Sequence, residues 1–373
     1  MKKYKILVTG GAGFIGSFLV DKLIQLGHSV TIFDNLEYQV HQGKKPQYLN
    51  PKAEFIKADV RHYDKLKKAL KNVEIVFHEA AAVGVAQSNY EIKRYVDVNI
   101  GGTANLLDMI VNHPGMRVKK IIITSSMTIY SEGCYACPKC GIFKAELRPP
   151  EQLKTKNWQI TCPQCQSKTK PVPIKETALS SRSSIYALTK KFQDELILLI
   201  AKMYQIPAVI LRCFNVYGPR QSISNPYTGV TAIFISRLKN DQQPVIYEDG
   251  LQTRDFISVH DVVNALILAM NSKAVNYQII NIASGKSTTI KKIALITAKL
   301  MNKKIKPKIT HTFRKNDIRH CFADNTKAKK LLNWQPKISL NRGMKELIDW
   351  SQTQTALDNF QQAEKKLLQK KLL

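Results

Sequence analysis

Residues 5–16 read KILVTGGAGFIG, and this stretch decides the fold. The apolar run Lys5–Val8 predicts a buried strand, and the glycines after it predict a tight turn into a helix over Gly13–Leu26. Glycine tolerates the unusual backbone angles of such a turn and lets the main chain approach a pyrophosphate, while the helix N-terminus offers free N–H donors. The stretch therefore predicts a dinucleotide site with contacts from Gly10, Gly13, Phe14, Ile15 and Gly16.

Short apolar segments and amphipathic segments alternate through the rest of the first half of the chain. Strands are expected at Ser29–Phe33, Glu54–Ala58, Ile75–His78 and Lys120–Thr124, and helices at Lys65–Lys71 and Asn99–Asn112. A helix over Ser184–Tyr204, a strand over Ala208–Arg212 and a helix over Val259–Met270 follow. This alternation predicts an α/β protein with a doubly wound, Rossmann-type parallel sheet covered by helices on both faces.

Asp34 narrows the choice of dinucleotide. It ends the second expected strand, 21 residues after Gly13. A carboxylate there can accept hydrogen bonds from both hydroxyls of the adenosine ribose and repels a 2′-phosphate, so NAD is favoured over NADP. NADP stays open as the alternative because basic neighbours can override the acid. Asp59 and Val60, after the third strand, are expected at the adenine.

Tyr186 and Lys190 open the helix expected over Ser184–Tyr204. Residues at i and i+4 share a helix face, so the Lys190 ammonium is expected to lower the pKa of the Tyr186 phenol from its ordinary value near 10. Tyr186 would then transfer protons at neutral pH. Ser126 follows the strand Lys120–Thr124, at the edge of the sheet where ligands bind, and can hydrogen-bond the reacting oxygen. The combination predicts hydride transfer between a nicotinamide and a hydroxyl.

Several further motifs resemble the NAD-dependent nucleotide-sugar epimerase/dehydratase group of the extended short-chain dehydrogenases/reductases. They are HEAA at 78–81, Asn99 with Gly102-Thr103, RCFNVYGPR at 212–220, RDF at 254–256 and NIASG at 281–285. The resemblance covers nearly the whole chain except the cysteine-rich segment and the tail. It implies that Ser126, Tyr186 and Lys190 are the catalytic triad, that NAD is the cofactor, and that the chain forms a homodimer through the helices at Asn99 and Ser184.

The resemblance also implies contacts beyond the glycine turn. The candidate cofactor contacts there are Asn35, Ala80, Ala81, Asn99 and Ser125, together with Tyr186 and Lys190. Asn215 and Arg254 match the positions that hold the diphosphate of a dTDP- or UDP-sugar, a task suited to the planar fork of arginine. The remaining candidate substrate contacts are Ser126, Arg220, Asn225 and Arg319.

The residues after Ser126 discriminate between reactions of the family. Members that eliminate water resemble one another in carrying Asp-Glu directly after the catalytic hydroxyl residue, whereas this chain has Met127 and Thr128 there. A decarboxylating relative would be expected to carry a glutamate nearby. What remains is removal of hydride from C4 of the sugar and its return to the other face, with tightly bound NAD. A 4-ketosugar reductase, a UDP-hexose or UDP-hexuronate 4-epimerase, and a non-catalytic NAD-binding scaffold stay open.

The cysteine-rich segment 131–175 interrupts the strand–helix alternation and is expected to be an insertion. It contains the pairs Cys137–Cys140 and Cys162–Cys165, with 21 residues between them. Four thiolates in two close pairs satisfy tetrahedral zinc and leave no open position for water, so a structural, ribbon-like zinc site is predicted. Redox or disulfide use is the alternative. Cys134 is expected to be unliganded, and the segment is a candidate wall of the sugar pocket.

The position of this insertion, together with residues 224–234, resembles the dTDP-L-rhamnose 4-epimerase branch of the family. That branch interconverts dTDP-L-rhamnose and dTDP-6-deoxy-L-talose, and the resemblance makes this pair the leading substrate and product. The expected domains are an NAD-binding Rossmann domain over 1–130 and 176–212, the inserted segment, a mainly substrate-binding α/β region over 213–352, and a tail over 353–373.

The net charge of +29 arises from lysines spread along the chain. Because no nucleic-acid recognition motif accompanies them, a nucleic-acid partner is not expected, although the positive field would attract an anionic substrate. The apolar runs are too short to span a bilayer. The first of them ends at Thr9-Gly10, as a strand does, and not as a secretory signal does, so a cytoplasmic enzyme is expected.

Overall fold

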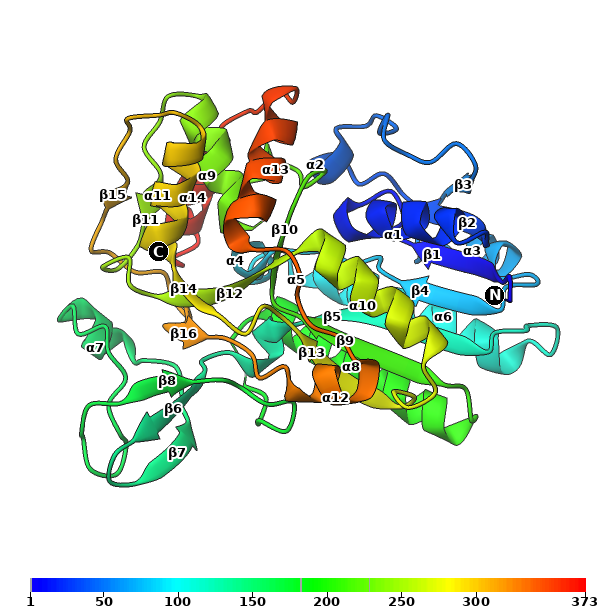
Figure 1. Ribbon diagram of the computed structural model, residues 1–373, viewed down its shortest axis with the longest axis horizontal. Helices are drawn as coiled ribbons and strands as arrows, with labels where there is room; N and C mark the ends of the chain where they lie inside the picture. The colour runs from blue at the N-terminus through cyan, green and yellow to red at the C-terminus, as the bar shows by residue number, and fades with distance from the viewer. Residues whose placement is uncertain (1, 182, 228) are drawn as a thin grey trace.

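The computed structural model describes residues 2–181, 183–227 and 229–373. Its centre is a parallel sheet of seven strands in the order β13-β9-β5-β4-β1-β2-β3 (Figure 1). The strands are β1 (Lys5–Thr9), β2 (Ser29–Asp34), β3 (Glu54–Lys57), β4 (Ile75–His78), β5 (Lys120–Ser126), β9 (Ala208–Cys213) and β13 (Gln278–Ile282). The predicted doubly wound Rossmann sheet is confirmed. The ends of the six predicted strands agree to within two residues, whereas β13 was not predicted.

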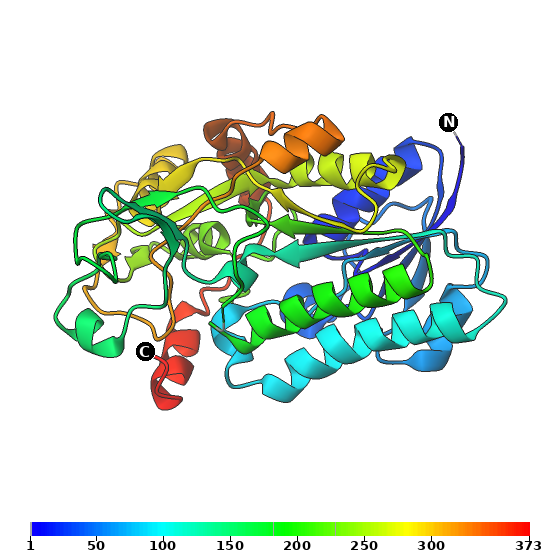
Figure 2. The same cartoon turned by 90° about the horizontal axis from the view of Figure 1, so that it is seen from below.

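Helices cover both faces of this sheet (Figure 2). One face carries α1 (Phe14–Gln25), α10 (Val259–Asn271) and α12 (Thr326–Leu332), and the other carries α3 (Tyr63–Ala69), α6 (Gly102–Asn112) and α8 (Ile185–Met203). Alternate residues of a strand point to opposite faces. On β1, Ile6 and Val8 accordingly enter the first hydrophobic core and Leu7 the second.

Short helices lie between these elements on the side of the carboxyl ends of the strands. They are α2 (Tyr38–His41), α4 (Val85–Ser88), α5 (Ile92–Tyr95), the π-helical turn η1 (Val96–Gly101) that leads into α6, and the 3-10 turn η2 (Met127–Tyr130). The helix expected from Asn99 therefore begins with a π-helical turn and becomes regular at Gly102.

A second region with its own hydrophobic core follows β9. Its sheet contains β10 (Asn215–Tyr217), β12 (Thr253–Ser258), β14 (Ser287–Thr289) and β16 (His320–Cys321), and β11 (Val245–Ile246) pairs with β15 (Lys308–Ile309). The helices are α9 (Val230–Lys239), α11 (Ile290–Leu300), α13 (Leu340–Gln352) and, in the tail, α14 (Phe360–Gln369). Thr228, within the stretch 224–234, lies outside the described residues.

The inserted segment projects beside this second region (Figure 1, lower left). It forms an antiparallel sheet in the order β7-β6-β8, from β6 (Cys134–Cys137), β7 (Gly141–Lys144) and β8 (Lys170–Val172), with the short helix α7 (Pro150–Lys154). We call residues 131–175 the cysteine module. Within the residues described, no helix is both long and apolar enough to cross a membrane.

Candidate active site

The glycine turn after β1 has the geometry that close approach of a phosphate requires. Gly10 has a φ of +68°, a value that favours glycine, and its N–H donates to the Phe33 carbonyl oxygen (2.8 Å). A Cβ on Gly16 would lie 2.3 Å from the Gly10 carbonyl oxygen. The helix α1 begins at Phe14 after the N-cap Gly13, which has no side chain to occupy the first N–H groups. These groups therefore face the end of the sheet as potential phosphate donors.

Asp34 ends β2, and Asp59 lies two residues after the end of the neighbouring strand β3. The Asp34 carboxylate accepts hydrogen bonds from the N–H groups of Ala12 (3.0 Å) and Leu36 (2.8 Å), while burial raises its pKa. Burial also opposes ionisation of Asp59, but hydrogen bonds from Arg61 and Asn35 outweigh it and lower the pKa of Asp59 to about 2. Asp34 is thus held in place by the glycine turn itself.

One pocket runs along the carboxyl ends of the parallel strands, the edge at which ligands bind in such sheets. It is lined by all but one of the predicted cofactor contacts, namely Gly10, Gly13, Phe14, Ile15, Gly16, Asp34, Asn35, Asp59, Val60, Ala80, Ala81, Ser125, Tyr186 and Lys190. Asn99 is fully buried behind it and binds Ala82 and Thr189 through its side chain. Asn99 therefore supports the pocket wall instead of lining it.

Ser126 and Tyr186 meet in this pocket although they lie on β5 and α8. The Ser126 Oγ accepts hydrogen bonds from the N–H of Thr128 (3.2 Å) and from its hydroxyl (2.9 Å). With its lone pairs used in this way, the Ser126 hydroxyl proton is left to donate to the Tyr186 oxygen or to a substrate oxygen. The Tyr186 ring packs edge-on against Tyr95, with the centroids 6.3 Å apart.

The structure corrects the expected role of Lys190. Its Nζ donates to the Thr124 carbonyl oxygen (2.8 Å) and to Gln193 Oε1 (2.6 Å), and not to Tyr186. Burial raises the pKa of Tyr186 to about 12, opposed by a hydrogen bond with Ser126. Desolvation of the phenol therefore outweighs any effect of the lysine, and the protein alone does not make Tyr186 a ready base.

The predicted substrate contacts separate into two groups. Asn215 and Asn225 line the pocket with Ser126, and Asn225 is fixed by Gln39 and by the N–H of Tyr227. Arg220 and Arg319 are corrections to the prediction. Arg220 binds Asp21 (2.8 Å) and packs on aromatic rings beside α1. Arg319 is fully buried, and its guanidinium binds Glu248 and Asp249, so it cannot reach a substrate.

Arg254 has a partner that sequence reasoning missed. Asp317 binds both Arg254 (3.4 Å) and Arg314 (2.8 Å), so two guanidinium groups converge on one carboxylate. Neither Arg254 nor Arg314 lines the pocket, but Arg254 shares a strand face with Phe256, which does, because alternate residues of β12 point the same way. Arg314 is 38% exposed. In the sequence, only the Arg-x-x-Asp spacing of Arg314 and Asp317 could have indicated that these two side chains form an ion pair.

Comparison with known proteins identifies the family. The model of the "NAD dependent epimerase/dehydratase family" matches residues 6–283. The chain belongs to this family. The dTDP-L-rhamnose 4-epimerase of Burkholderia thailandensis is 36% identical over 354 residues, which cover 93% of this chain and 94% of that protein.

Two solved structures show the same architecture. The UDP-N-acetylglucosamine 4-epimerase of Methanobrevibacter ruminantium M1, in complex with UDP-N-acetylmuramic acid, has a TM-score of 0.77 and 32% identity over 95% of this chain and all of that chain. The UDP-glucuronic acid 4-epimerase of Bacillus cereus, in complex with UDP-glucuronic acid and NAD, has a TM-score of 0.77 and 28% identity over 93% of this chain and 99% of its own.

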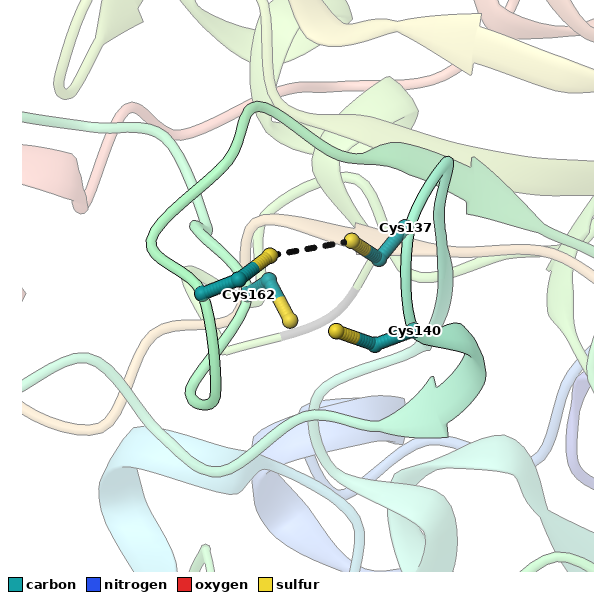
Figure 3. A group of neighbouring side chains, drawn as sticks. Cys137, Cys140 and Cys162 are labelled. Atoms are coloured by element: carbon teal, nitrogen blue, oxygen red, sulfur yellow. Dashed lines mark hydrogen bonds between the residues drawn. The ribbon is translucent and has the colours of Figure 1, made fainter.

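The cysteine pairs of this family member come together as predicted. The Sγ atoms of Cys137, Cys140, Cys162 and Cys165 all lie within 4.8 Å of one another, and those of Cys137 and Cys165 are 3.5 Å apart. Zinc–sulfur bonds of about 2.3 Å in a tetrahedron place sulfur atoms about 3.8 Å apart, so the cluster fits zinc. The sulfur atoms point to one centre from two separate loops (Figure 3). Cys134 is outside this cluster.

The cysteine module does not wall the pocket. Among the residues that the structure describes, none from 131–175 lines it. The module packs instead against the chain around β16, through a bridge between Ile174 and Ala323. The contacts of the module with the rest of the chain therefore lie outside the pocket lining.

Glu79, within the HEAA motif, lines the pocket, and burial raises its pKa to about 7 against the opposing effects of Thr124 and the Lys190 charge. A carboxyl with a raised pKa binds its proton more tightly in the folded protein, so stability falls as pH rises from its ordinary value of 4.5 to about 7. Glu79→Gln removes this loss. As the pH rises from 5 to 8, we expect the free energy of unfolding of the variant to increase relative to that of wild type by on the order of 2 kcal/mol.

Urea unfolding of both proteins at the two pH values measures this difference. Glu146→Gln makes the same change at an exposed position and is the control. A difference between Glu79→Gln and wild type that stays constant with pH would contradict a buried carboxyl that titrates near neutrality.

Proposed function

We propose that this protein is an NAD-dependent nucleotide-sugar 4-epimerase that inverts C4 through a transient 4-keto intermediate. The observation that carries the proposal is a single pocket that joins the glycine turn and Asp34 to the Ser126–Tyr186 pair. Met127 and Thr128 line the same pocket at the positions where eliminating relatives carry acids. Residues 1–130 and 176–212 are the proposed NAD-binding domain. Residues 213–352 are the region that we propose mainly binds the sugar.

NAD, held by the glycine turn and Asp34, would supply removal of the hydride from C4 and its return to the opposite face. The Tyr186 oxygen takes the proton of the C4 hydroxyl and gives it back in the second half of the cycle. Ser126, whose oxygen is occupied by Thr128, donates a hydrogen bond to the reacting oxygen. The positive charge of oxidised NAD would favour the Tyr186 phenolate, whereas Lys190 binds the Thr124 carbonyl oxygen and Gln193.

We propose dTDP-L-rhamnose and dTDP-6-deoxy-L-talose as the substrate pair. The similarity to the Burkholderia thailandensis enzyme over 93% of the chain supports this choice. UDP-sugars are the alternative, because the two solved relatives were obtained with UDP-sugars. Arg254, Arg314 and Asn215 are the proposed contacts of the diphosphate, and Asn225 is a further proposed contact of the substrate.

The test is incubation of the purified protein with dTDP-L-rhamnose without added cofactor, followed by NMR of the sugar. We expect inversion at C4 and NAD that stays with the protein. Parallel incubations with UDP-glucose and UDP-glucuronate decide the nucleotide and sugar. Turnover of a 4-ketosugar only with added NADH or NADPH, and no inversion of any of the three sugars, would overturn the epimerase in favour of a reductase.

We also propose that the cysteine cluster holds one structural zinc ion. Four thiolates complete the coordination and leave no position for a reacting water, so zinc would stabilise the module and take no part in the chemistry. Metal analysis of the purified protein is expected to give one zinc per chain. Cytoplasmic location and the lack of a nucleic-acid partner stay predictions.

A homodimer is the proposed assembly. On α8, Leu188, Phe192, Leu199 and Met203 form an apolar face that is at least 39% exposed at every position. The adjoining α5 and η1 add Ile92 and Val96 to this face. Exposed apolar patches of this kind mark interfaces.

The double variant F192E/L199E is expected to convert the dimer into monomers that still carry NAD, because it places two charges at the centre of the apolar face. Light scattering after size-exclusion chromatography measures the mass. Leu295→Glu introduces one charge at an equally exposed position on α11 and should leave the dimer intact. A wild-type monomer, or a dimer that tolerates both glutamates, would contradict the proposed interface.

A further inference from the structure

Arg148 extends from the cysteine module into the interior of the second region. Its guanidinium forms a two-point ion pair with Glu248 (3.0 and 2.8 Å), and the side chain is only 1% exposed. It also donates to the carbonyl oxygens of Trp158 within the module and of Asp317 outside it, each at 3.1 Å. Glu248 receives Arg319 as well (2.9 Å). A buried charge network therefore joins the module to the segment that contains Asp317.

Glu132 makes a second connection at the start of the module. It is fully buried, and its carboxylate accepts hydrogen bonds from the N–H groups of Arg319 (2.6 Å) and His320 (2.9 Å). The hydroxyl of Tyr135 on β6 donates to the same carboxylate (2.8 Å). This carboxylate therefore ties the strand that leads to the cysteine cluster to the main chain of residues 319–320.

A third connection closes the far end of the module. The N–H of Ile174 donates to the Phe322 carbonyl oxygen, and the Ile174 carbonyl oxygen accepts from the N–H of Asp324, both at 2.9 Å. The start, the middle and the end of the module thus all bind residues 317–324. No other element of the second region is held by the module at so many points among the contacts described above.

Residues 317–319 orient the proposed diphosphate arginine. The Arg254 guanidinium donates to the carbonyl oxygens of Ile318 (2.8 Å) and Arg319 (3.3 Å) and to Asp317, which also binds Arg314. A shift of this segment would move both arginines together. The segment has no regular structure before β16, so external contacts must hold it in place.

The module has little apolar core with which to hold its own shape. Its buried cluster consists of Tyr135, Ala145 and Ile160, with Phe143 packed against it. Its strands have at most four residues, and sheets of this size need further constraints to be stable in water. A metal that joins the two cysteine loops supplies such a constraint.

We propose that the metal-loaded cysteine module is a positioning element for substrate binding, in which Arg148 and Glu132 hold residues 317–320 so that Arg254 and Arg314 can bind the diphosphate. This inference rests on the proposed function. The module acts on affinity for the nucleotide sugar and leaves the NAD site and the proton-transfer pair unchanged, because no described residue of the module touches them.

The first test removes the metal from the full-length protein with a zinc chelator and then restores it with zinc chloride. Binding of dTDP and of UDP is measured by calorimetry, with zinc and NAD content determined on the same samples. We expect at least tenfold weaker binding of whichever nucleotide the protein prefers, unchanged NAD content, and recovery on adding zinc. Unchanged nucleotide affinity after complete loss of the metal would overturn the proposal.

The second test compares Arg148→Met with Lys154→Ala, which removes one positive charge from an exposed position of the same module. Arg148→Met is expected to raise KM and the Kd for dTDP or UDP at least tenfold, with kcat within twofold of wild type. Lys154→Ala should match wild type. If Arg148→Met loses NAD and kcat as much as nucleotide affinity, the module serves general stability and the proposal fails.

The metal set has its own matched pair. Cys140→Ser is expected to lose zinc and to reproduce the weaker nucleotide binding, whereas Cys134→Ser, on the same hairpin but outside the cluster, should retain both. Loss of zinc in Cys140→Ser with full nucleotide affinity would overturn the proposal. Because dTDP and UDP binding need no turnover, these outcomes are distinct from a failure of the epimerase assignment, which would appear as absent C4 inversion with intact binding.

Discussion

Tyr186→Phe is expected to lower turnover by about 10³-fold while NAD stays bound, because a positioned proton-transfer group contributes factors of this size. Phenylalanine keeps the ring that packs against Tyr95 and removes only the hydroxyl that meets Ser126. The fold, the glycine turn and the Asp34 carboxylate are untouched by this change. The loss should therefore fall on kcat, with little change in the affinity for the nucleotide sugar.

The measurement is the rate of C4 inversion at saturating substrate, together with the NAD content of the purified variant. Tyr204→Phe removes a hydroxyl at the other end of α8, where the side chain is exposed, and should behave as wild type. A Tyr186→Phe variant that keeps a tenth or more of the turnover would remove Tyr186 from the proton-transfer role.

The Gly16→Ala variant is expected to contain no bound NAD after purification. The added Cβ would stand 2.3 Å from the Gly10 carbonyl oxygen and 2.8 Å from the Gly11 Cα, and backbone atoms at this distance must move. Opening the turn displaces the N-terminus of α1, whose N–H groups are the proposed phosphate donors. Overpacking of this kind costs about 1–3 kcal/mol, which corresponds to about 5- to 150-fold weaker binding if it is expressed in NAD affinity.

NAD released from the denatured protein, followed by titration of the emptied protein with NAD, measures this loss. The control is Gly115→Ala, at a position where an added Cβ meets nothing within 4 Å. A normal NAD content in Gly16→Ala would contradict the prediction. The phosphates of NAD would then have to bind elsewhere than at this turn.

Most of the fold could be predicted from local patterns along the chain. Apolar strands at regular spacing and the glycine stretch specify a parallel sheet, because buried strands and turn glycines have few alternatives. The two cysteine pairs could also be predicted from the sequence, because each pair is local. Only the contact between the two loops depends on the tertiary structure. The positions of Asp34 and Tyr186 followed from their places at a strand end and at a helix start.

The partners of long charged side chains were harder to predict than the helices and strands on which they lie. Arg319 was expected at the substrate, but its neighbours Glu248 and Asp249 lie 71 and 70 residues away along the chain and bury its charge completely. Lys190 was expected to face Tyr186 by helix spacing, yet Thr124 on β5 offers its ammonium a carbonyl oxygen. For both residues, the partner of the side chain was decided by segments that are distant along the chain.

The sequence by itself determined the parallel sheet, the glycine turn with Asp34, the Tyr186–Lys190 pair at a helix start and each of the two cysteine pairs. Each of these features depends on residues near one another along the chain, where backbone geometry leaves little choice. Only the tertiary structure decided which charges pair. It placed Arg148 on Glu248, 100 residues away, and Glu132 on the N–H of Arg319, 187 residues away. A buried charge must find an opposite partner, and that partner is set by how distant segments pack.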